Sequence, residues 1–339
     1  MFKFTYRACR GSIKSAIPLF LLVLLLSCHK SGGGSPEGSG TIYVAGYSGS
    51  LSSNTAGAFW ENGQYMIVPQ SKPIMAMCVA DSDLYLLAGN TYWKNDFPHQ
   101  IPYANISSSS AIAVSGSDVY VVAQIDTQHA VYFKNDSLVD LTPGIEVQLD
   151  YSATATGIAI SGNDIYICGN LHDTAVYWKN GTINYLAGGY QAVAIAVSGD
   201  NVYVAGYSDM EQPVYWRNGV LSVLQPQFAQ VTCIAASGND VYIGGATGGV
   251  NQAMYWKNGK GMPLAGGAVD YGILVRGNSL YAAGVANPGL AVYWVNGVIH
   301  SLGAGSASSI AVGPQILPVD KSSKYHHCGM RGVEGLADL

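Results

Sequence analysis

Charged side chains are scarce in this chain. Asp, Glu, Lys and Arg make up 11% of the 339 residues, whereas hydrophobic residues make up 49%. Strands that are buried on both faces have such a composition, so the sequence predicts stacked sheets. Apolar residues also show no helical periodicity in the repeated part of the chain, which indicates an all-β protein.

Cysteine is too rare to build a disulfide framework. Three of the six cysteines, Cys78, Cys168 and Cys233, fall in apolar, strand-like segments of different repeats. A thiol in such a segment is usually a small buried hydrophobe. Bridges among these three are not expected, so packing is predicted to supply the stability.

Familiar catalytic and calcium-binding motifs are missing. The chain contains no D-x-D-x-D-G loop, no H-E-x-x-H and no G-x-S-x-G. His326, His327 and Cys328 lie side by side but lack the spacing of a structural zinc site. No cofactor and no metal are therefore predicted.

The first 28 residues have the features of a bacterial lipoprotein signal. Four basic residues precede the apolar run Ala16–Leu26, and Leu25-Leu26-Ser27-Cys28 resembles a lipobox. Eleven apolar residues are too few for a membrane span, which needs about 20. We expect Cys28 to be lipidated, with an ordinary signal peptide or a membrane anchor as the alternatives. The Gly/Ser-rich residues 29–40 are expected to act as a tether.

The rest of the chain is acidic. Removal of residues 1–28 leaves 12 basic and 21 acidic residues, a formal charge of −9. This charge disfavours nucleic acid and anionic lipid as partners. The sequence predicts a monomer in the cell envelope, at the outer membrane, that meets the membrane through its lipid only.

One short word occurs seven times: an aromatic pair, a variable residue, and Asn-Gly or Asn-Asp. Its copies begin at positions 59, 92, 132, 177, 215, 255 and 293. A second word, seen in AIAVSGDNVYVAG at 194–206, lies between the copies. Asn-Gly favours a tight hairpin turn, so each unit is predicted to be four antiparallel strands.

Seven units over Ile42–Val312 give about 39 residues each, which is typical of propeller blades. The array begins with a second strand, Ile42–Gly46, and ends with a lone first strand, Ser309–Val312. Pairing of the two would remove both free sheet edges. The sequence therefore predicts a seven-bladed β-propeller of four-stranded antiparallel blades over 41–313, closed by its N- and C-terminal strands. An open β-solenoid is the alternative, and residues 314–339 are expected to form a disordered tail.

These words resemble the HAF-type extracellular repeat proteins and the YWKNG-repeat lipoproteins of Bacteroidota. The resemblance covers roughly Ile42–Val312 and includes a Leu five residues after the turn glycine, as at Leu186 and Leu224. It implies an envelope propeller and no agreed biochemical activity.

Strand alternation places the uniform turns on one rim and the variable connections on the other, where ligands usually bind. The candidate ligand-binding aromatic residues on the variable rim are Tyr47, Tyr151, Tyr190, Tyr207 and Phe228. The polar candidates are His129, His172, Asp173, Asp209 and Glu211. The aromatic residues could instead cap gaps between blades. The acids could be solvated loop charge or could hold Ca²⁺.

The sequence favours a non-catalytic binding scaffold for a glycan or a protein. The words AIAVSG, GIAISG, CIAASG and GILVRG, which are expected to form inner strands, are apolar apart from Arg276. This shortage of charged side chains disfavours a catalytic channel. The alternatives are a propeller lyase or hydrolase with acid and base residues on its loops, and a structural spacer in an envelope complex. The recurring turn acids and hairpin lysines are interpreted as turn formers and edge charges rather than as catalysts.

Overall fold

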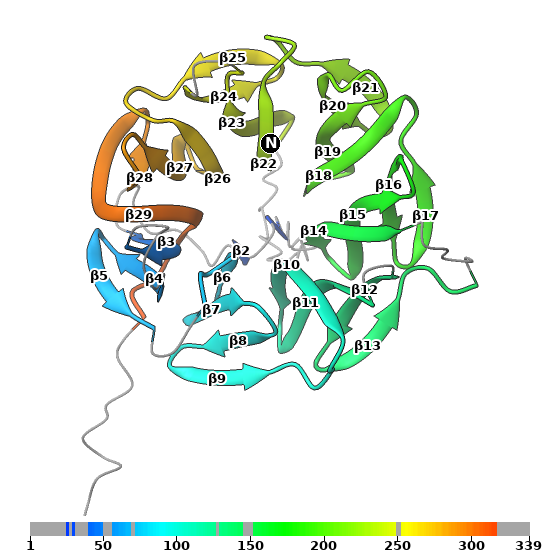
Figure 1. The fold of residues 1–339 in the computed structure, drawn as a ribbon, viewed down its shortest axis with the longest axis horizontal. Coiled ribbons are helices and arrows are strands. Elements are labelled where there is room, and N and C mark those ends of the chain that lie inside the picture. Colours follow the sequence, from blue (N-terminus) through cyan, green and yellow to red (C-terminus); the bar gives the residue numbers. More distant parts are fainter. Residues whose placement is uncertain are drawn as a thin grey trace, which may run out of the picture.

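A computed structural model describes residues 25–26, 29–30, 40–49, 56–68, 72–126, 129–144, 152–248 and 252–316. These residues form an all-β propeller, in which antiparallel sheets stand in a ring around a central axis. In each four-stranded sheet the first strand lies toward the centre and the last strand lies at the periphery (Figure 1).

Five sheets have four strands each, in sequence order. The first two are β6 (Ala76–Ala80), β7 (Asp83–Ala88), β8 (Thr91–Lys94) and β9 (Phe97–Gln100), and β10 (Ile106–Ser115), β11 (Asp118–Ile125), β12 (His129–Lys134) and β13 (Ser137–Asp140). The third is β14 (Ala153–Ser161), β15 (Asp164–Leu171), β16 (Thr174–Lys179) and β17 (Thr182–Tyr185). The last two are β18 (Gly189–Ser198), β19 (Asn201–Ser208), β20 (Pro213–Arg217) and β21 (Val220–Val223), and β22 (Gln230–Ser237), β23 (Asp240–Ala246), β24 (Ala253–Lys257) and β25 (Lys260–Pro263).

The prediction of seven four-stranded blades is wrong. The structure has five such blades. Seven of the other described strands form one sheet in the order β26-β27-β28-β29-β3-β4-β5, and the two short strands at 25–26 and 29–30 pair with each other. The strands of this larger sheet are β26 (Val269–Arg276), β27 (Ser279–Ala286), β28 (Leu290–Val295), β29 (Val298–Gly313), β3 (Thr41–Ser48), β4 (Ala56–Glu61) and β5 (Gln64–Ile67). The cause is β29, whose 16 residues run without a break, so that its first part pairs with β28 and its second part with β3.

The two ends of the array pair as the sequence predicts. Ser309 lies opposite Ala45 and Val312 opposite Ile42 in an antiparallel ladder. The ring is thereby closed by a strand near the end of the chain and a strand near its beginning.

The Asn turns have the predicted type I′ geometry where Gly follows Asn. Asn218 and Gly219, for example, have φ values of 50° and 82°. The Asn218 side chain also accepts a hydrogen bond from the backbone N–H of Val202 at 2.8 Å, and the six other turn asparagines make the equivalent bond. Each turn is thus fixed to the start of the second strand, which explains why Asn recurs.

Four of the inner strands carry a bulge at a Ser or Thr whose hydroxyl links neighbouring sheets. In β14 the bulged residue is Thr156, and its Oγ1 lies 3.2 Å from the Cys168 carbonyl of its own sheet and 3.0 Å from the Ala192 carbonyl of the next. Ser110, Thr232 and Ser308 occupy equivalent places. Opposite the bulge in β18 a Cβ on Gly206 would lie 1.9 Å from the Gln191 carbonyl, so glycine is required there. Ala123 takes this place in β11, and nothing in the structure explains the difference.

The core lies between the sheets and contains five almost fully buried tryptophans. Trp60, Trp178, Trp216, Trp256 and Trp294 are at most 1% exposed. The indole N–H of Trp216 donates to the Ala187 carbonyl in the preceding inter-sheet link, at 3.1 Å. Cys168 and Cys233 are free thiols, so no bridge joins two of the three cysteines in the strand-like segments, as expected. Cys78 is disulfide-bonded, which the sequence did not predict.

Several predictions concern the two ends of the chain. Cys28 and most of 1–40 lie outside the described residues, apart from β1 (Leu25–Leu26), β2 (His29–Lys30) and Gly40. Pro314 and Ile316, expected in a disordered tail, are hydrogen-bonded to the Tyr43 hydroxyl at 2.9 and 2.8 Å. Residues 317–339 lie outside the described residues. None of the described segments forms an apolar helix of membrane-spanning length.

Candidate functional site

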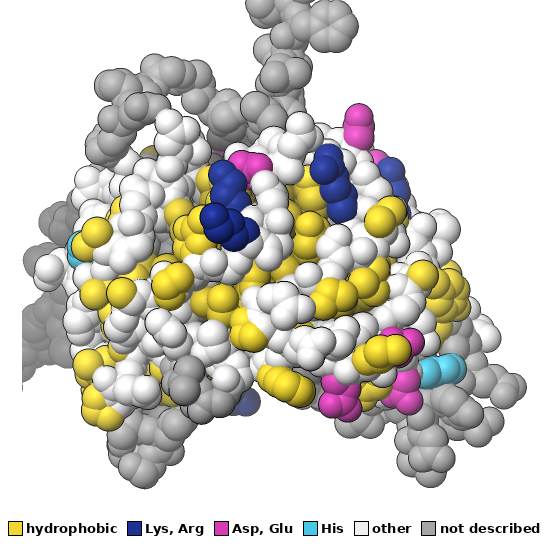
Figure 2. All heavy atoms as spheres, turned by 90° about the horizontal axis from the view of Figure 1, so that it is seen from above, with side chains coloured by type: hydrophobic (Ala, Val, Ile, Leu, Met, Phe, Trp, Pro, Cys, Tyr) yellow, Lys and Arg dark blue, Asp and Glu magenta, His cyan; other side chains and the backbone are white. Residues whose placement is uncertain are grey.

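The variable rim contains the second connection of each sheet and the links between sheets, and the uniform rim contains the first turns and the Asn turns. Figure 2 shows Lys and Arg side chains gathered toward one edge of the ring wall. A group of Asp and Glu side chains with a His lies toward the opposite edge. Asp and Glu side chains lie toward both edges of the face that Figure 2 shows, whereas the Lys and Arg side chains gather toward one of them.

Tyr207 and Tyr47 are less accessible to a ligand than the sequence suggests. The Tyr207 hydroxyl accepts a hydrogen bond from the Val231 N–H of the next sheet at 2.8 Å, and burial raises the pKa of Tyr207. Asn170 fills the same strand position in β15 and likewise bonds the next sheet, at Ala192. Tyr47 is half-buried in β3. Tyr207 thus joins two sheets, and Tyr151 lies outside the described residues.

Tyr190 and Phe228 are exposed, as a binding role requires. Tyr190 is 43% exposed at the start of β18, and Phe228 is 85% exposed in the link between β21 and β22. The sequence reasoning missed Met210, which is 76% exposed between β19 and β20. Gly189 pairs with Ser208, so Tyr190 and Met210 flank one strand pair on the variable rim. We call Tyr190, Met210 and Phe228 the apolar sector.

Asp209 and Glu211 border the apolar sector. Both are exposed and belong to the same connection as Met210. The backbone N–H of Asp209 donates to the Gly188 carbonyl at 3.0 Å, which holds this connection against the start of β18. The predicted binding acids therefore lie beside predicted aromatic residues at this point.

The other polar candidates are more scattered. His172 and Asp173 are exposed in the turn after β15, in the preceding sheet. His129 is half-buried in β12, with Nδ1 3.5 Å from the Thr142 hydroxyl. In the part of the chain that the structure describes, no three His, Cys, Asp or Glu side chains are placed to hold a metal ion. The possible Ca²⁺ role of the loop acids has no structural support in these segments.

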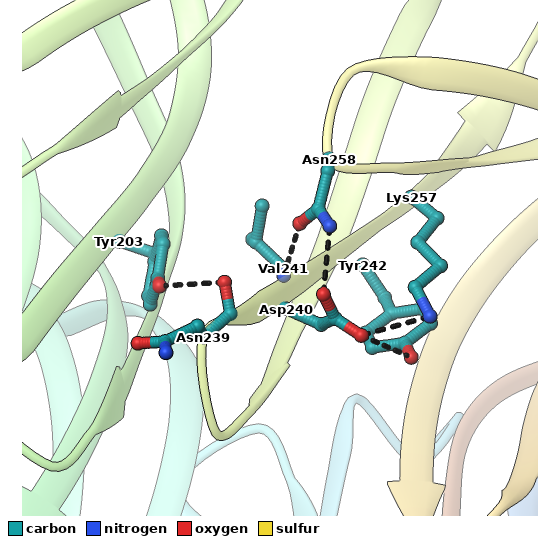
Figure 3. Close-up of polar contacts among 7 residues, drawn as sticks. All are labelled: Tyr203, Asn239, Asp240, Val241, Tyr242, Lys257 and Asn258. Atoms are coloured by element: carbon teal, nitrogen blue, oxygen red, sulfur yellow. Dashed lines mark hydrogen bonds and ion pairs between the residues drawn. The ribbon is translucent and has the colours of Figure 1, made fainter.

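The uniform rim repeats one polar cluster (Figure 3). Lys257 Nζ lies 2.8 Å from Asp240 Oδ2 and 5.2 Å from the centre of the Tyr242 ring. Asn258 donates to Asp240 Oδ1 at 2.7 Å and accepts from the Val241 N–H. The Lys257 ammonium and the Asn258 amide hold the pKa of Asp240 below its usual value, and the ion pair raises the pKa of Lys257.

The same cluster occurs in three further sheets. The ion pairs are Lys94–Asp83, Lys134–Asp118 and Lys179–Asp164, at 2.8 to 2.9 Å. The turn acids and hairpin lysines are therefore partners of one another. Such exposed pairs contribute little to stability because water screens them, so their main effect is to order the rim.

Grooves lie at two junctions of the uniform rim. One, of about 560 Å³, lies between the β22–β25 sheet and the start of the seven-stranded sheet, and the other, of about 430 Å³, lies between the β14–β17 and β18–β21 sheets. Each is lined by one Lys–Asp pair and two tyrosines. The sequence reasoning missed both grooves because their walls come from different repeats.

Asp270 is a buried acid in the inner strand β26. Its side chain is 0% exposed, and burial raises its pKa well above the usual value for Asp. Oδ1 accepts a hydrogen bond from the Gly272 N–H at 3.2 Å, while Oδ2 has no hydrogen-bond partner among the described residues. The sequence reasoning passed over Asp270, although the equivalent positions of other repeats hold Ala155, Ala192 and Val231.

No family model and no curated protein matches this chain. Solved structures that are similar to this chain include the three that follow. An extracellular domain assigned to the hybrid two component system BT3049 of B. thetaiotaomicron is 9% identical, with a TM-score of 0.47. Apo AztD from Citrobacter koseri is 10% identical with a TM-score of 0.42, and the Dos1 propeller is 13% identical with a TM-score of 0.40.

The match to the B. thetaiotaomicron domain covers 72% of this chain and 40% of that one. The corresponding shares are 81% and 99% for AztD, and 76% and 79% for the Dos1 propeller. The predicted resemblance to the YWKNG-repeat lipoproteins is not established by any matching family and stays a prediction.

Proposed function

We propose that this protein is a lipid-anchored, non-catalytic binding scaffold of the cell envelope, and that its partner docks on the variable rim. The observation that carries the proposal is the apolar sector, whose three side chains are between 43% and 85% exposed. Large apolar groups exposed together on a rigid frame are typical of interaction surfaces.

The chemistry of the sector favours a protein partner over a glycan. Met210 and Phe228 provide apolar area without a polar atom that could bond a sugar hydroxyl, and methionine adapts to irregular protein surfaces. Asp209 and Glu211 add negative charge at the border. A partner segment with apolar and basic side chains fits both features.

The absence of catalysis is part of the proposal. General acid–base chemistry needs a carboxyl or imidazole group held in a cleft that shifts its pKa. Asp173, Asp209 and Glu211 are exposed to water, and the four lysine-paired carboxylates of the uniform rim are held in ion pairs. The ion pairs lower the pKa of these four carboxylates, which favours the ionised form and weakens them as general acids and bases, so neither arrangement supplies such a group.

A peptide selection tests the docking surface. We expect a phage-displayed library of random peptides, selected on the purified protein, to yield binders rich in apolar and basic residues. Met210→Ser with Phe228→Ser should weaken these binders by about 30- to 1,000-fold, because exposed anchors of this kind contribute about 1–2 kcal/mol each, and every 1.4 kcal/mol is about tenfold in affinity.

The matched control is Val220→Ser with Val298→Ser, which removes two apolar side chains that are 69% and 62% exposed on outer strands. This variant should bind the selected peptides like the parent protein. Equal losses in the two double variants would place the binding outside the apolar sector and contradict the proposal.

The lipid anchor has its own test. Cys28→Ser should prevent lipidation, so we expect the protein to leave the membrane fraction or to accumulate as an unprocessed precursor. Labelling with a radioactive fatty acid and fractionation of cells measure both outcomes. Normal membrane partition of the variant would show that Cys28 is not the anchor.

A further inference from the structure

The two grooves of the uniform rim are built from equivalent residues. On one wall Ser237, Asp240, Tyr242, Tyr255 and Lys257 in the larger groove correspond to Ser161, Asp164, Tyr166, Tyr177 and Lys179 in the smaller. On the other wall Gly277, Asn278, Leu280 and Asn296 correspond to Gly199, Asp200, Val202 and Asn218. The repeat therefore makes the same hollow twice.

Each groove combines tyrosine rings that are buried or half-buried with a positively charged and a negatively charged side chain, which hold each other in place. Lys179 pairs with Asp164 at 2.9 Å, and Lys257 pairs with Asp240 at 2.8 Å. An anionic ligand would lie close to the carboxylate of a pair and a cationic ligand close to its ammonium group, and this like-charge contact is unfavourable. A neutral hydroxyl group can donate to the carboxylate and accept from the ammonium while the pair stays intact.

We propose that these grooves bind neutral pyranose units of an oligosaccharide. Tyr177 and Tyr255, which are half-buried, offer ring surface to the C–H groups of a sugar, and the ion pair and Asn side chains offer partners to its hydroxyls. Volumes of about 430 and 560 Å³ are in the usual range for small-ligand sites.

The junction between the β18–β21 and β22–β25 sheets provides an internal comparison. There Arg217 replaces the lysine, and its Nη2 lies 3.5 Å from Asn239 Oδ1 across the junction. Tyr203 also donates to the Asn239 carbonyl at 3.2 Å and is fully buried (Figure 3). Arg217 and Tyr203 thus connect the two neighbouring sheets across the place where a groove lies at the other two junctions. Tyr215, which is the equivalent of Tyr177 and Tyr255, is therefore not expected to contact a sugar.

This site is separate from the apolar sector on the opposite rim. A sugar in the grooves and a peptide on the variable rim use no common residue. The Met210→Ser, Phe228→Ser variant should therefore keep its sugar binding, and loss of either activity alone leaves the other proposal standing.

The test uses the purified protein and five hexasaccharides in titration calorimetry and saturation-transfer NMR. Three are neutral, with β-1,4-glucose, α-1,4-glucose or β-1,4-mannose units, and two are charged, hexagalacturonate and hexaglucosamine. We expect at least one neutral probe to bind and both charged probes to bind at least 10-fold more weakly. Tyr177→Ala with Tyr255→Ala should lower the affinity at least 10-fold, whereas Tyr215→Ala should leave it unchanged.

A second variant keeps the test valid if the tyrosine variant does not fold. Asp164→Asn with Asp240→Asn changes only partly exposed carboxylates and leaves both ammonium groups unpaired. We expect weaker binding of the neutral probe and at least 10-fold stronger binding of hexagalacturonate. The proposal is overturned if no neutral probe binds, if a charged probe binds the parent protein better, or if Tyr215→Ala is as harmful as the Tyr177, Tyr255 pair.

Discussion

A chain that stops after Ser308 is expected to lose most of its free energy of unfolding. The missing part of β29 pairs with β3 from Ser309↔Ala45 to Gly313↔Thr41. It also buries Ile310 and Val312, which are 8% and 1% exposed. About four ladder hydrogen bonds at ~1 kcal/mol each and two buried aliphatic side chains at ~1.5–3 kcal/mol each amount to roughly 7–10 kcal/mol. Most domains have only about 5–15 kcal/mol in total.

The proper reference is a chain that stops after Ile316. Both truncated chains lack residues 317–339, so their difference isolates the closing strand and the contacts of Pro314 and Ile316 with Tyr43. Urea unfolding followed by tryptophan fluorescence gives the two free energies. Midpoints that agree within error would show that the ring does not depend on this closure.

Much of the fold follows from the repeated words. The segments 194–198 and 202–206, expected as strands, lie within β18 and β19, and the Asn-Gly turns have the expected positive φ values. The number of four-stranded blades does not follow from the repeated words, because the number of repeats does not show whether the last strand of one blade and the first strand of the next are separate or continuous. Here Gly303 and Gly305, both with positive φ, let β29 continue from one strand partner to the next.

The candidate sites were harder to predict than the fold. Tyr190 and Phe228 are exposed as expected, but the similar residue Tyr207 is used between sheets, and only the register of neighbouring sheets distinguishes them. Lys179 and Asp164 are 15 residues apart in sequence and meet because β15 pairs with β16. Contacts of this kind depend on strand register, which single residue types do not reveal.

Asp270 is the clearest departure from the repeat. Gly244 accompanies it, because a Cβ there would lie 2.4 Å from both Asp270 Oδ2 and Cys233 Sγ. The equivalent position in β19 holds Ala205. Asp270, Gly244 and Cys233 therefore depart from the repeat together, because the acid and the thiol occupy the space that a side chain at position 244 would need. Burial of a carboxylate is unfavourable and raises the pKa of Asp270 in the folded protein, although the backbone N–H groups of Gly272 and Ala283 act in the opposite direction, so the fold favours the protonated form.

The stability of the protein is accordingly expected to decrease as the pH rises. The pKa of Asp270 is raised in the folded protein and is about 4 in the unfolded chain. Above pH 4 the unfolded chain releases a proton that the folded protein retains. The free energy of unfolding should then fall by up to ~1.4 kcal/mol per pH unit until Asp270 ionises in the folded state. The pKa of Cys233 is also raised, so that thiol stays neutral over this range.

Asp270→Asn should remove this decrease, because an amide has the shape of the protonated acid and does not ionise. We expect the variant to match the parent protein near pH 4 and to be the more stable of the two at pH 8, in the direction set by the linkage above. The measurement is urea unfolding at pH 4 to 8. Asp173→Asn, which changes an exposed acid in a turn, is the control and should follow the parent curve. If Asp270→Asn and the parent protein lose stability in parallel as the pH rises, Asp270 is not held protonated, and its Oδ2 must have a partner that stabilises the charge.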